Sequence, residues 1–160
     1  MSASVIPNRL IFVWFGSRLP DAARIAIRSA ARWCRPEELW LLHEGLDADD
    51  PEIRALVEEV GLDLRDAGPQ WFDGIPAAEV ARGLYETMSW PASRSNLLRL
   101  AALHRHGGVY LDTDTICVRD LAPLREHEGF CGRERLTMPG DLVRSRNPLR
   151  WGAAGVRMGV

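Results

Sequence analysis

The strongest constraint on the fold is an unbroken apolar run near the start of the chain, Leu10 to Phe15, which ends at Gly16. The run is rich in β-branched and aromatic residues and has no polar residue at alternate positions. A strand with one face in water would alternate apolar and polar residues. This run therefore indicates a strand that is covered on both faces, as in a parallel sheet.

Helical and β-type patterns alternate along the rest of the chain, which predicts an α/β fold with a mainly parallel sheet. The expected strands are residues 10–15, 39–42, 62–65, 109–111 and 116–118. The expected helices begin at Asp21, at Pro51 after the N-cap Asp50, near Ala77, and at a cap on Ser93 or Ser95. The first helix should bury Ala22, Ile25, Ala26, Ser29, Ala30 and Trp33, and should expose Arg24, Arg28 and Arg32.

Bulk composition narrows the possible functions. A chain of 160 residues is one domain by length, so we expect residues 1–160 to form a single domain. The net charge of −2 argues against a nucleic-acid partner. Three cysteines without a C-x-x-C pair indicate neither a disulfide framework nor a zinc site. No signal peptide is apparent and no apolar run approaches the ~20 residues that span a bilayer, so we expect a cytoplasmic protein without a transmembrane segment.

Two aspartates stand at the end of the fourth expected strand, where the stretch from Gly107 to Asp114 ends in Asp112-Thr113-Asp114. In an extended segment alternate side chains share a face, so Asp112 and Asp114 should point the same way, with Cα atoms roughly 6.6 Å apart. Hard carboxylate oxygens at that spacing predict a Mg²⁺ or Mn²⁺ site. Arg99, one helix upstream, could add a fixed cation for phosphate or sugar oxygens.

This motif alone does not decide the function, because the chain contains a second copy, Asp47-Ala48-Asp49. The second copy precedes an expected helix, so we interpret it as a solvated turn with capping acids. Asp112 and Asp114 follow a strand, a context that fits either a metal site or a turn. Trp14 and Phe15 should lie at the same sheet edge, where they could stack on a base or belong to the core.

Two separated blocks of the sequence resemble a known family. Residues 95–99 (Ser-Asn-Leu-Leu-Arg), Leu103 and residues 107–114 are similar to the S-D-x-x-R, leucine and G-G-x-Y-x-D-x-D signature of the DXD-containing sugar-binding glycosyltransferases. Residues 6–16 resemble the family's opening, I-P-K-x-I-H-F-V-W-F-G. The family includes α-1,6-mannosyltransferases, capsular polysaccharide transferases and, distantly, the catalytic domains of glucosylating toxins. The resemblance covers roughly residues 5–125 and leaves 126–160 unassigned.

The resemblance implies a GT-A-like fold that binds a UDP- or GDP-hexose donor together with Mn²⁺ or Mg²⁺. It also assigns roles by motif position. Val13 and Trp14 would hold the base, and Asn96 and Arg99 would contact the donor sugar or phosphates, with Tyr110 nearby. Asp114 would bind the metal directly, and Asp112 would contact the ribose, the sugar or a metal-bound water. Arg99 and Asp112 would be the catalytic residues. The family usually has an aspartate at the position of Asn96, and an amide keeps the hydrogen-bond geometry but drops the charge.

The sequence thus predicts a metal-dependent glycosyltransferase that moves a hexose from a nucleoside-diphosphate sugar to a hydroxyl acceptor, with retention as the family implies. The acceptor would be a glycan, a lipid-linked sugar or a small molecule. The family usually continues past the equivalent of Val160, so we expect a chain truncated at its C-terminus, and a non-catalytic binding remnant is the first alternative. The second alternative is a haloacid-dehalogenase-type phosphohydrolase, in which Asp112 would attack phosphorus and Asp114 would act as acid and base.

Overall fold

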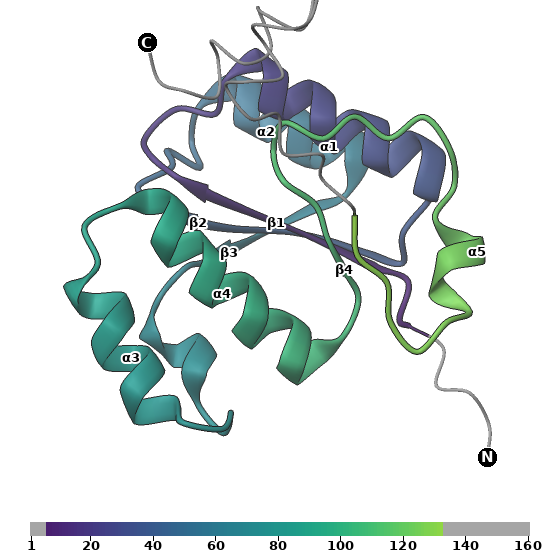
Figure 1. Cartoon of the computed structure of the whole chain (residues 1–160). Coiled ribbons are helices and arrows are strands. Elements are labelled where there is room, and N and C mark those ends of the chain that lie inside the picture. Colours follow the sequence, from purple (N-terminus) through teal and green to yellow (C-terminus); the bar gives the residue numbers. More distant parts are fainter. Residues whose placement is uncertain (1–5, 133–160) are drawn as a thin grey trace, which may run out of the picture. The chain divides into compact units, whose positions relative to one another are not determined.

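A computed structural model describes residues 6–132, and those up to Phe130 belong to one compact unit. Its centre is a four-stranded, all-parallel sheet with the strand order β3-β2-β1-β4, which confirms the predicted fold class (Figure 1). The strands are β1 (Arg9–Phe15), β2 (Glu38–Glu44), β3 (Leu62–Asp66) and β4 (Val109–Tyr110). The helices are α1 (Asp21–Cys34), α2 (Pro51–Val60), the 3₁₀ helix η1 (Pro69–Phe72), α3 (Ala78–Thr87), α4 (Pro91–His106) and α5 (Ala122–Arg125).

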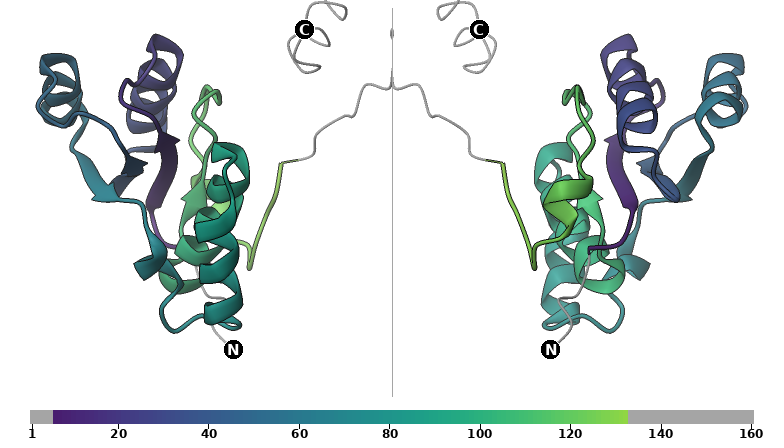
Figure 2. Two further views of the ribbon diagram at one scale, coloured as in Figure 1. Left: turned by 90° about the vertical axis from the view of Figure 1, so that its left-hand side faces the viewer. Right: turned by 90° about the vertical axis from the view of Figure 1, so that its right-hand side faces the viewer.

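Helices cover both faces of the sheet, with α1 and α2 on one side and α3 and α4 on the other (Figure 2). Successive side chains of β1 therefore enter two different cores. Leu10 and Phe12 pack in the core under α1 and α2, and Ile11 and Val13 pack in the core under α4. All four are almost fully buried, as the unbroken apolar run predicts. In the described part of the chain, no helix combines the length and apolarity needed to span a bilayer.

The predicted buried stripe of α1 is correct at Ala26 and Ala30 and wrong at its other positions. The helix also buries Ala23, Arg24, Ile27 and Cys34, whereas Ile25 and Trp33 are 53% and 47% exposed. Arg24 is 9% exposed rather than solvated, because its guanidinium pairs with Asp21 and with Glu52 of α2. A long side chain can cover apolar surface with its stem while its charged end stays paired, and this pairing between helices is invisible to a periodicity argument.

The segment that carries the two aspartates is not extended as predicted. Strand β4 has two residues, and one further bond, from Leu111 N to Ile11 O at 3.0 Å, continues its pairing with β1. Asp112 then begins a turn that is closed by a bond of 2.9 Å from Thr115 N to Asp112 O. The argument for aspartates 6.6 Å apart on one strand face is therefore wrong, because the strand ends before them.

The segment after this turn also departs from the prediction, since residues 116–118 form no strand. This segment lies against α1 instead. Cys117 is buried in the core, and its backbone N–H donates to Ser29 Oγ at 2.9 Å. Helix α4 likewise begins at Pro91, after Trp90, so neither Ser93 nor Ser95 is its N-cap. Ser95 lies in the second turn, where its hydroxyl is available for a tertiary contact.

The glycine pair before β4 lets the chain pass close to β1. Gly107 ends α4 as predicted. Gly108 has φ +100°, and a Cβ added there would lie 2.7 Å from the carbonyl oxygen of Arg9. Contacts that short do not occur in folded proteins, so only glycine allows β4 to pair with β1 at this point.

Candidate functional site

The carboxyl ends of the four parallel strands lie at one edge of the sheet, and the first half of α4 lies beside this edge. Arg94, in the first turn of α4, pairs with Glu44 at the end of β2. At the other end of the helix, the carbonyl of His106 accepts a bond from Arg9, the first residue of β1. The helix thus runs opposite to the strands and brings its N-terminal half to the edge where ligands bind in α/β folds.

A chain of contacts holds Asp112 at this edge. The hydroxyl of Tyr110 donates to Asp112 Oδ1 at 2.9 Å and lies 3.2 Å from Ser95 Oγ, which is left to donate to it. Arg99 Nη1 lies 3.8 Å from Asp112 Oδ1, and its guanidinium lies 5.1 Å from the centre of the Tyr110 ring. Asn96 Oδ1 accepts a bond from Arg99. Predicted site residues from α4, β4 and the following turn therefore form one cluster.

Electrostatics keep Tyr110 protonated in this cluster. Burial raises the pKa of Tyr110 to about 12, with a further upward contribution from its bond to Asp112 and an opposing one from Ser95. The phenol therefore stays a hydrogen-bond donor throughout the physiological pH range. It occupies one oxygen of Asp112, whose side chain is 61% exposed, and within residues 6–132 the second oxygen, called the outer oxygen below, has no hydrogen bond or ion pair.

Asp114 lies in the exposed part of the same turn, and within residues 6–132 its carboxylate has no hydrogen bond or ion pair. Together with the outer oxygen of Asp112 it offers hard oxygen ligands of the kind that Mg²⁺ and Mn²⁺ prefer. Among the described residues, no three His, Cys, Asp or Glu side chains gather closely enough to hold a metal. The donor set fits a cation that takes most of its ligands from water or a bound phosphate, as Mg²⁺ usually does.

The two residues predicted to hold a base face opposite sides of the sheet. Val13 is 5% exposed and packs on the α4 side, the side of Tyr110. Trp14 packs against the core under α1 and α2. Its indole Nε1 is buried without a partner among the described residues and would lie 3.6 Å from a Cβ on Gly16. Trp14 is thus partly buried against this core, on the side of the sheet opposite to Val13 and Tyr110.

Sequence reasoning missed a second cluster at this edge. Arg94 binds both oxygens of Glu44, at 2.9 and 2.5 Å, and its guanidinium lies 4.8 Å from the ring centre of Phe15 and 4.3 Å from that of Tyr85. Its hydrogen bonds to Glu44 lower the pKa of that carboxyl. The pair fixes the start of α4 against β2. Since its members are 50 residues apart, no local pattern could have found it.

Comparisons with known proteins find a matching family, a sequence relative and a solved structure with a similar fold. The family described as "glycosyltransferase sugar-binding region containing DXD motif" matches residues 20–131. An uncharacterised protein of Arabidopsis thaliana is 48% identical over 45 residues, which are 28% of this chain and 7% of the relative. The solved structure of PaToxG glycosyltransferase superposes with a TM-score of 0.54 at 17% identity, over 72% of this chain and 44% of that one. The chain thus spans less than half the length of either protein, and the structural match supports the GT-A-like fold.

Proposed function

Because the chain belongs to the family of glycosyltransferases with a DXD-containing sugar-binding region, we propose that it transfers a hexose from UDP- or GDP-hexose to a hydroxyl acceptor. The reaction would depend on Mn²⁺ or Mg²⁺ and retain the anomeric configuration. The acceptor would be a glycan, a lipid-linked sugar or a small molecule. The observation that supports this best is the orientation of Asp112 by Tyr110 and Arg99, close in sequence to Asp114, which has no partner within residues 6–132, at the carboxyl edge of a parallel sheet.

In this proposal Asp114 and the outer oxygen of Asp112 hold the metal ion. When bound, the ion would neutralise charge on the leaving diphosphate. Tyr110 and Ser95 keep the Asp112 carboxylate in one orientation, so it does not need to be ordered when the donor binds. Within α4, Ser95 takes part in this arrangement through its bond to Tyr110.

Arg99 and Asn96 would contact the donor. Arg99 uses one amino group on Asn96 and keeps further donors for phosphate or sugar oxygens. Asn96 still has its amide N–H groups, which can donate to a sugar hydroxyl where the family's usual aspartate can only accept. Val13 and Trp14 would lie nearest the base, at the end of β1.

Calorimetric titration of the chain with UDP and GDP, with and without Mn²⁺, tests the proposal. We expect one of the two nucleotides to bind only when the metal is present, and EDTA to abolish that binding. Transfer is then tested by incubation with the matching labelled nucleotide sugar. Absence of metal-dependent binding of either nucleotide would contradict the proposal.

Asn96 at the family's aspartate position favours one other candidate, a domain that binds the nucleotide sugar without transferring it. Metal-dependent nucleotide binding without donor hydrolysis or transfer would support that candidate. Family membership argues against a phosphohydrolase, and failure to release phosphate from p-nitrophenyl phosphate would exclude this chemistry on that substrate.

A further inference from the structure

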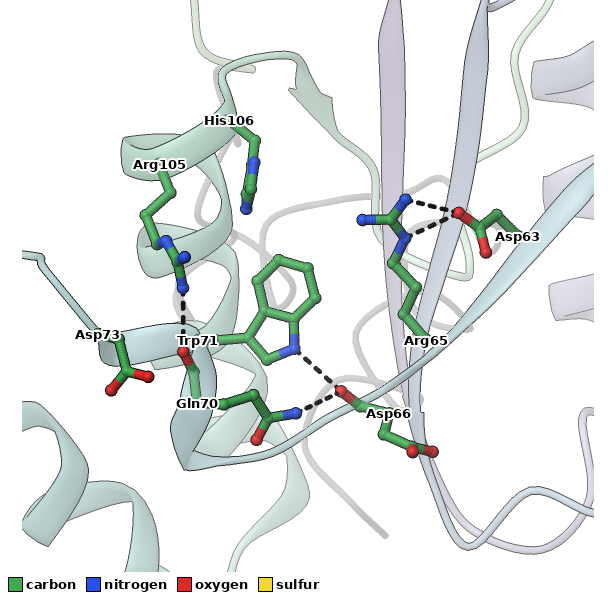
Figure 3. Close-up of a pocket in the computed structure, with 8 residues that line it drawn as sticks. All are labelled: Asp63, Arg65, Asp66, Gln70, Trp71, Asp73, Arg105 and His106. Carbon is green, nitrogen blue, oxygen red and sulfur yellow. Dashed lines mark hydrogen bonds and ion pairs between the residues drawn. The ribbon is translucent and has the colours of Figure 1, made fainter.

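An open cavity at the surface lies at the end of α4 opposite to the donor cluster. It has a volume of about 660 Å³ and is bounded by β3, by η1 and by the last turn of α4 (Figure 3). None of the residues assigned to the donor site lines it. His106 lies seven positions after Arg99 on α4. At about 1.5 Å per residue, the cavity is therefore ~10 Å along the helix from the donor cluster. This cavity needs a separate explanation.

The charges around the cavity are mixed. The lining contains three acids, Asp63, Asp66 and Asp73, and two arginines, Arg65 and Arg105. Asp63 is engaged by Arg65, at 2.6 and 2.8 Å, and Asp73 by Arg82. A phosphate would meet three carboxylates, and a cation would meet two guanidinium groups. The lining therefore disfavours strongly charged ligands of either sign and fits a neutral polar one.

Several hydrogen-bonding groups in the cavity remain available. Asp66 uses its backbone carbonyl to accept bonds from Trp71 Nε1 at 2.9 Å and from Gln70 Nε2 at 3.0 Å. Its carboxylate has no hydrogen-bond or ion-pair partner within residues 6–132, and Figure 3 shows the two bonds to its backbone carbonyl. Arg105 spends one N–H on the carbonyl of Gln70, at 2.9 Å, and keeps other donors.

His106 adds both a donor and an acceptor. In the described part of the chain its imidazole makes no hydrogen bond, although its backbone carbonyl accepts one from Arg9. Burial lowers the pKa of His106, and the positive charges of Arg105, Arg9 and Arg65 lower it further, while Glu38 opposes them. The ring is therefore mostly neutral at pH 7 and offers one N–H and one bare nitrogen.

Two tryptophan rings pack around His106 and hold its imidazole in place. His106 packs edge to face on Trp71 and on Trp40, with ring centres 5.5 and 5.3 Å apart. Trp71 is 7% exposed and is one of the residues that line the cavity. Binding pockets typically combine such apolar surface with a few oriented polar groups.

We propose that this cavity binds a neutral saccharide, namely a sugar unit of a glycan acceptor distant from the hydroxyl that reacts. Each hydroxyl of a hexose both donates and accepts, so a saccharide can bond to acceptors such as the Asp66 carboxylate, to the Arg105 donors and to either nitrogen of His106. Its C–H groups can contact Trp71. The assignment to an acceptor rests on the proposed transferase function, whereas saccharide binding itself can be measured without it.

Saturation-transfer NMR on the full chain tests the site, with trisaccharides of glucose, mannose and galactose as probes. We expect at least one probe to bind, and Asp66→Ala and His106→Ala each to weaken that binding at least tenfold. The matched control is Glu58→Ala, an exposed acid of α2 on the other face of the sheet, which should bind like the unmodified chain. Asp66→Ala keeps the backbone carbonyl to which Trp71 and Gln70 bond, so we expect this variant to fold. Its result therefore tests the site even if His106→Ala does not fold.

Metal-dependent nucleotide binding, measured on the same variants, separates this proposal from the proposed function. Unchanged nucleotide binding with lost saccharide binding supports two separate sites. If no probe binds the unmodified chain, or if both variants bind it equally well, the saccharide site is refuted and the transferase function stands. If saccharide binds and depends on Asp66 and His106 but neither nucleotide binds, the site is supported and the proposed function fails.

Discussion

The chain contains the same short acidic pattern twice, and the surroundings of the two copies differ. In Asp47-Ala48-Asp49 the acids serve the local backbone. Asp47 Oδ1 accepts the N–H of Asp49 at 2.9 Å, and Asp49 pairs with Arg54. The adjacent Asp50 caps α2 by accepting from Glu52 N at 2.7 Å. These contacts confirm the interpretation of this copy as a turn with capping acids.

In the second copy the contacts connect the acid to another helix. Tyr110, which bonds to Asp112, is only two residues away in sequence, but its hydroxyl lies 3.2 Å from Ser95 Oγ of α4, and Arg99 of α4 lies 3.8 Å from Asp112 Oδ1. Asp112 is held by Tyr110 of β4 and faces Arg99 of α4, and among the described residues Asp114 is bonded to neither an arginine nor a backbone N–H. Both copies lie in turns, so local conformation does not distinguish them. In the first copy the acids bond to the backbone of their own turn and to Arg54, whereas in the second copy Asp112 is oriented by a tyrosine that contacts a different helix, α4.

The largest expected effect comes from replacing the last acid of each copy. Asp114→Asn removes the charge of an acid that has no competing partner within residues 6–132. It should weaken Mn²⁺-dependent binding of UDP or GDP at least about 100-fold, roughly 3 kcal/mol. Asp49→Asn should leave that binding unchanged, because Asp49 serves only its own turn and Arg54. Isothermal titration of both variants checks this, and equal losses in the two would remove the distinction between the copies.

A second substitution tests the backbone that positions the Asp112 turn. Gly108→Ala forces a side chain onto φ +100° and places its Cβ 2.7 Å from Arg9 O, so it should cost about 2 kcal/mol or more of unfolding free energy. Gly61→Ala, at the end of α2, is the matched control. It has φ +65° but open space around the added Cβ, so it should cost only about 1 kcal/mol. Urea denaturation measures both, and similar losses would show that the approach of β4 to β1 is unimportant.

The features that sequence predicted correctly depend on near neighbours. The unbroken run of β1 requires burial on both faces, and Gly61 and Gly107 end α2 and α4 where their patterns stop. The cap at Asp50 follows from its position directly before Pro51. In each case a few adjacent residues carry enough information, because the effect acts within one turn or one strand.

What sequence could not supply is the pairing of distant side chains. Alanines on several sides of α1 left its buried stripe ambiguous, and Glu52 on another helix decided that Arg24 is buried. Ser95 reads as a helix cap until β4 brings Tyr110 within 3.2 Å of it. The cavity at His106 likewise depends on where β3 and η1 meet the end of α4. Such contacts follow from the topology and not from local periodicity.

Removing the hydroxyl of Tyr110, which bonds to Asp112, should have an intermediate effect on metal-dependent nucleotide binding. Tyr110→Phe keeps the buried ring but deletes the group that links Ser95 to Asp112. A hydrogen bond to a charged acceptor is worth about 1.5 kcal/mol or more, so metal-dependent nucleotide binding should fall about tenfold. Tyr85→Phe is the control, since its hydroxyl is 3.4 Å from Glu44 and does not touch Asp112. An unchanged affinity in Tyr110→Phe would mean that Asp112 does not need to be oriented in advance.

The smallest expected effect is a loss of stability on replacing Asp50, the residue directly after Asp47-Ala48-Asp49. Asp50→Ala removes the side-chain acceptor for Glu52 N while Pro51 still begins the helix, and the loss of such a cap typically costs about 1 kcal/mol of unfolding free energy. Nucleotide and metal binding should not change, because α2 covers the opposite face of the sheet from α4 (Figure 2). Urea denaturation and the same titrations measure the two quantities. Reduced nucleotide binding in Asp50→Ala would mean that the acids before α2 also support the ligand site, and that the two copies differ in degree and not in role.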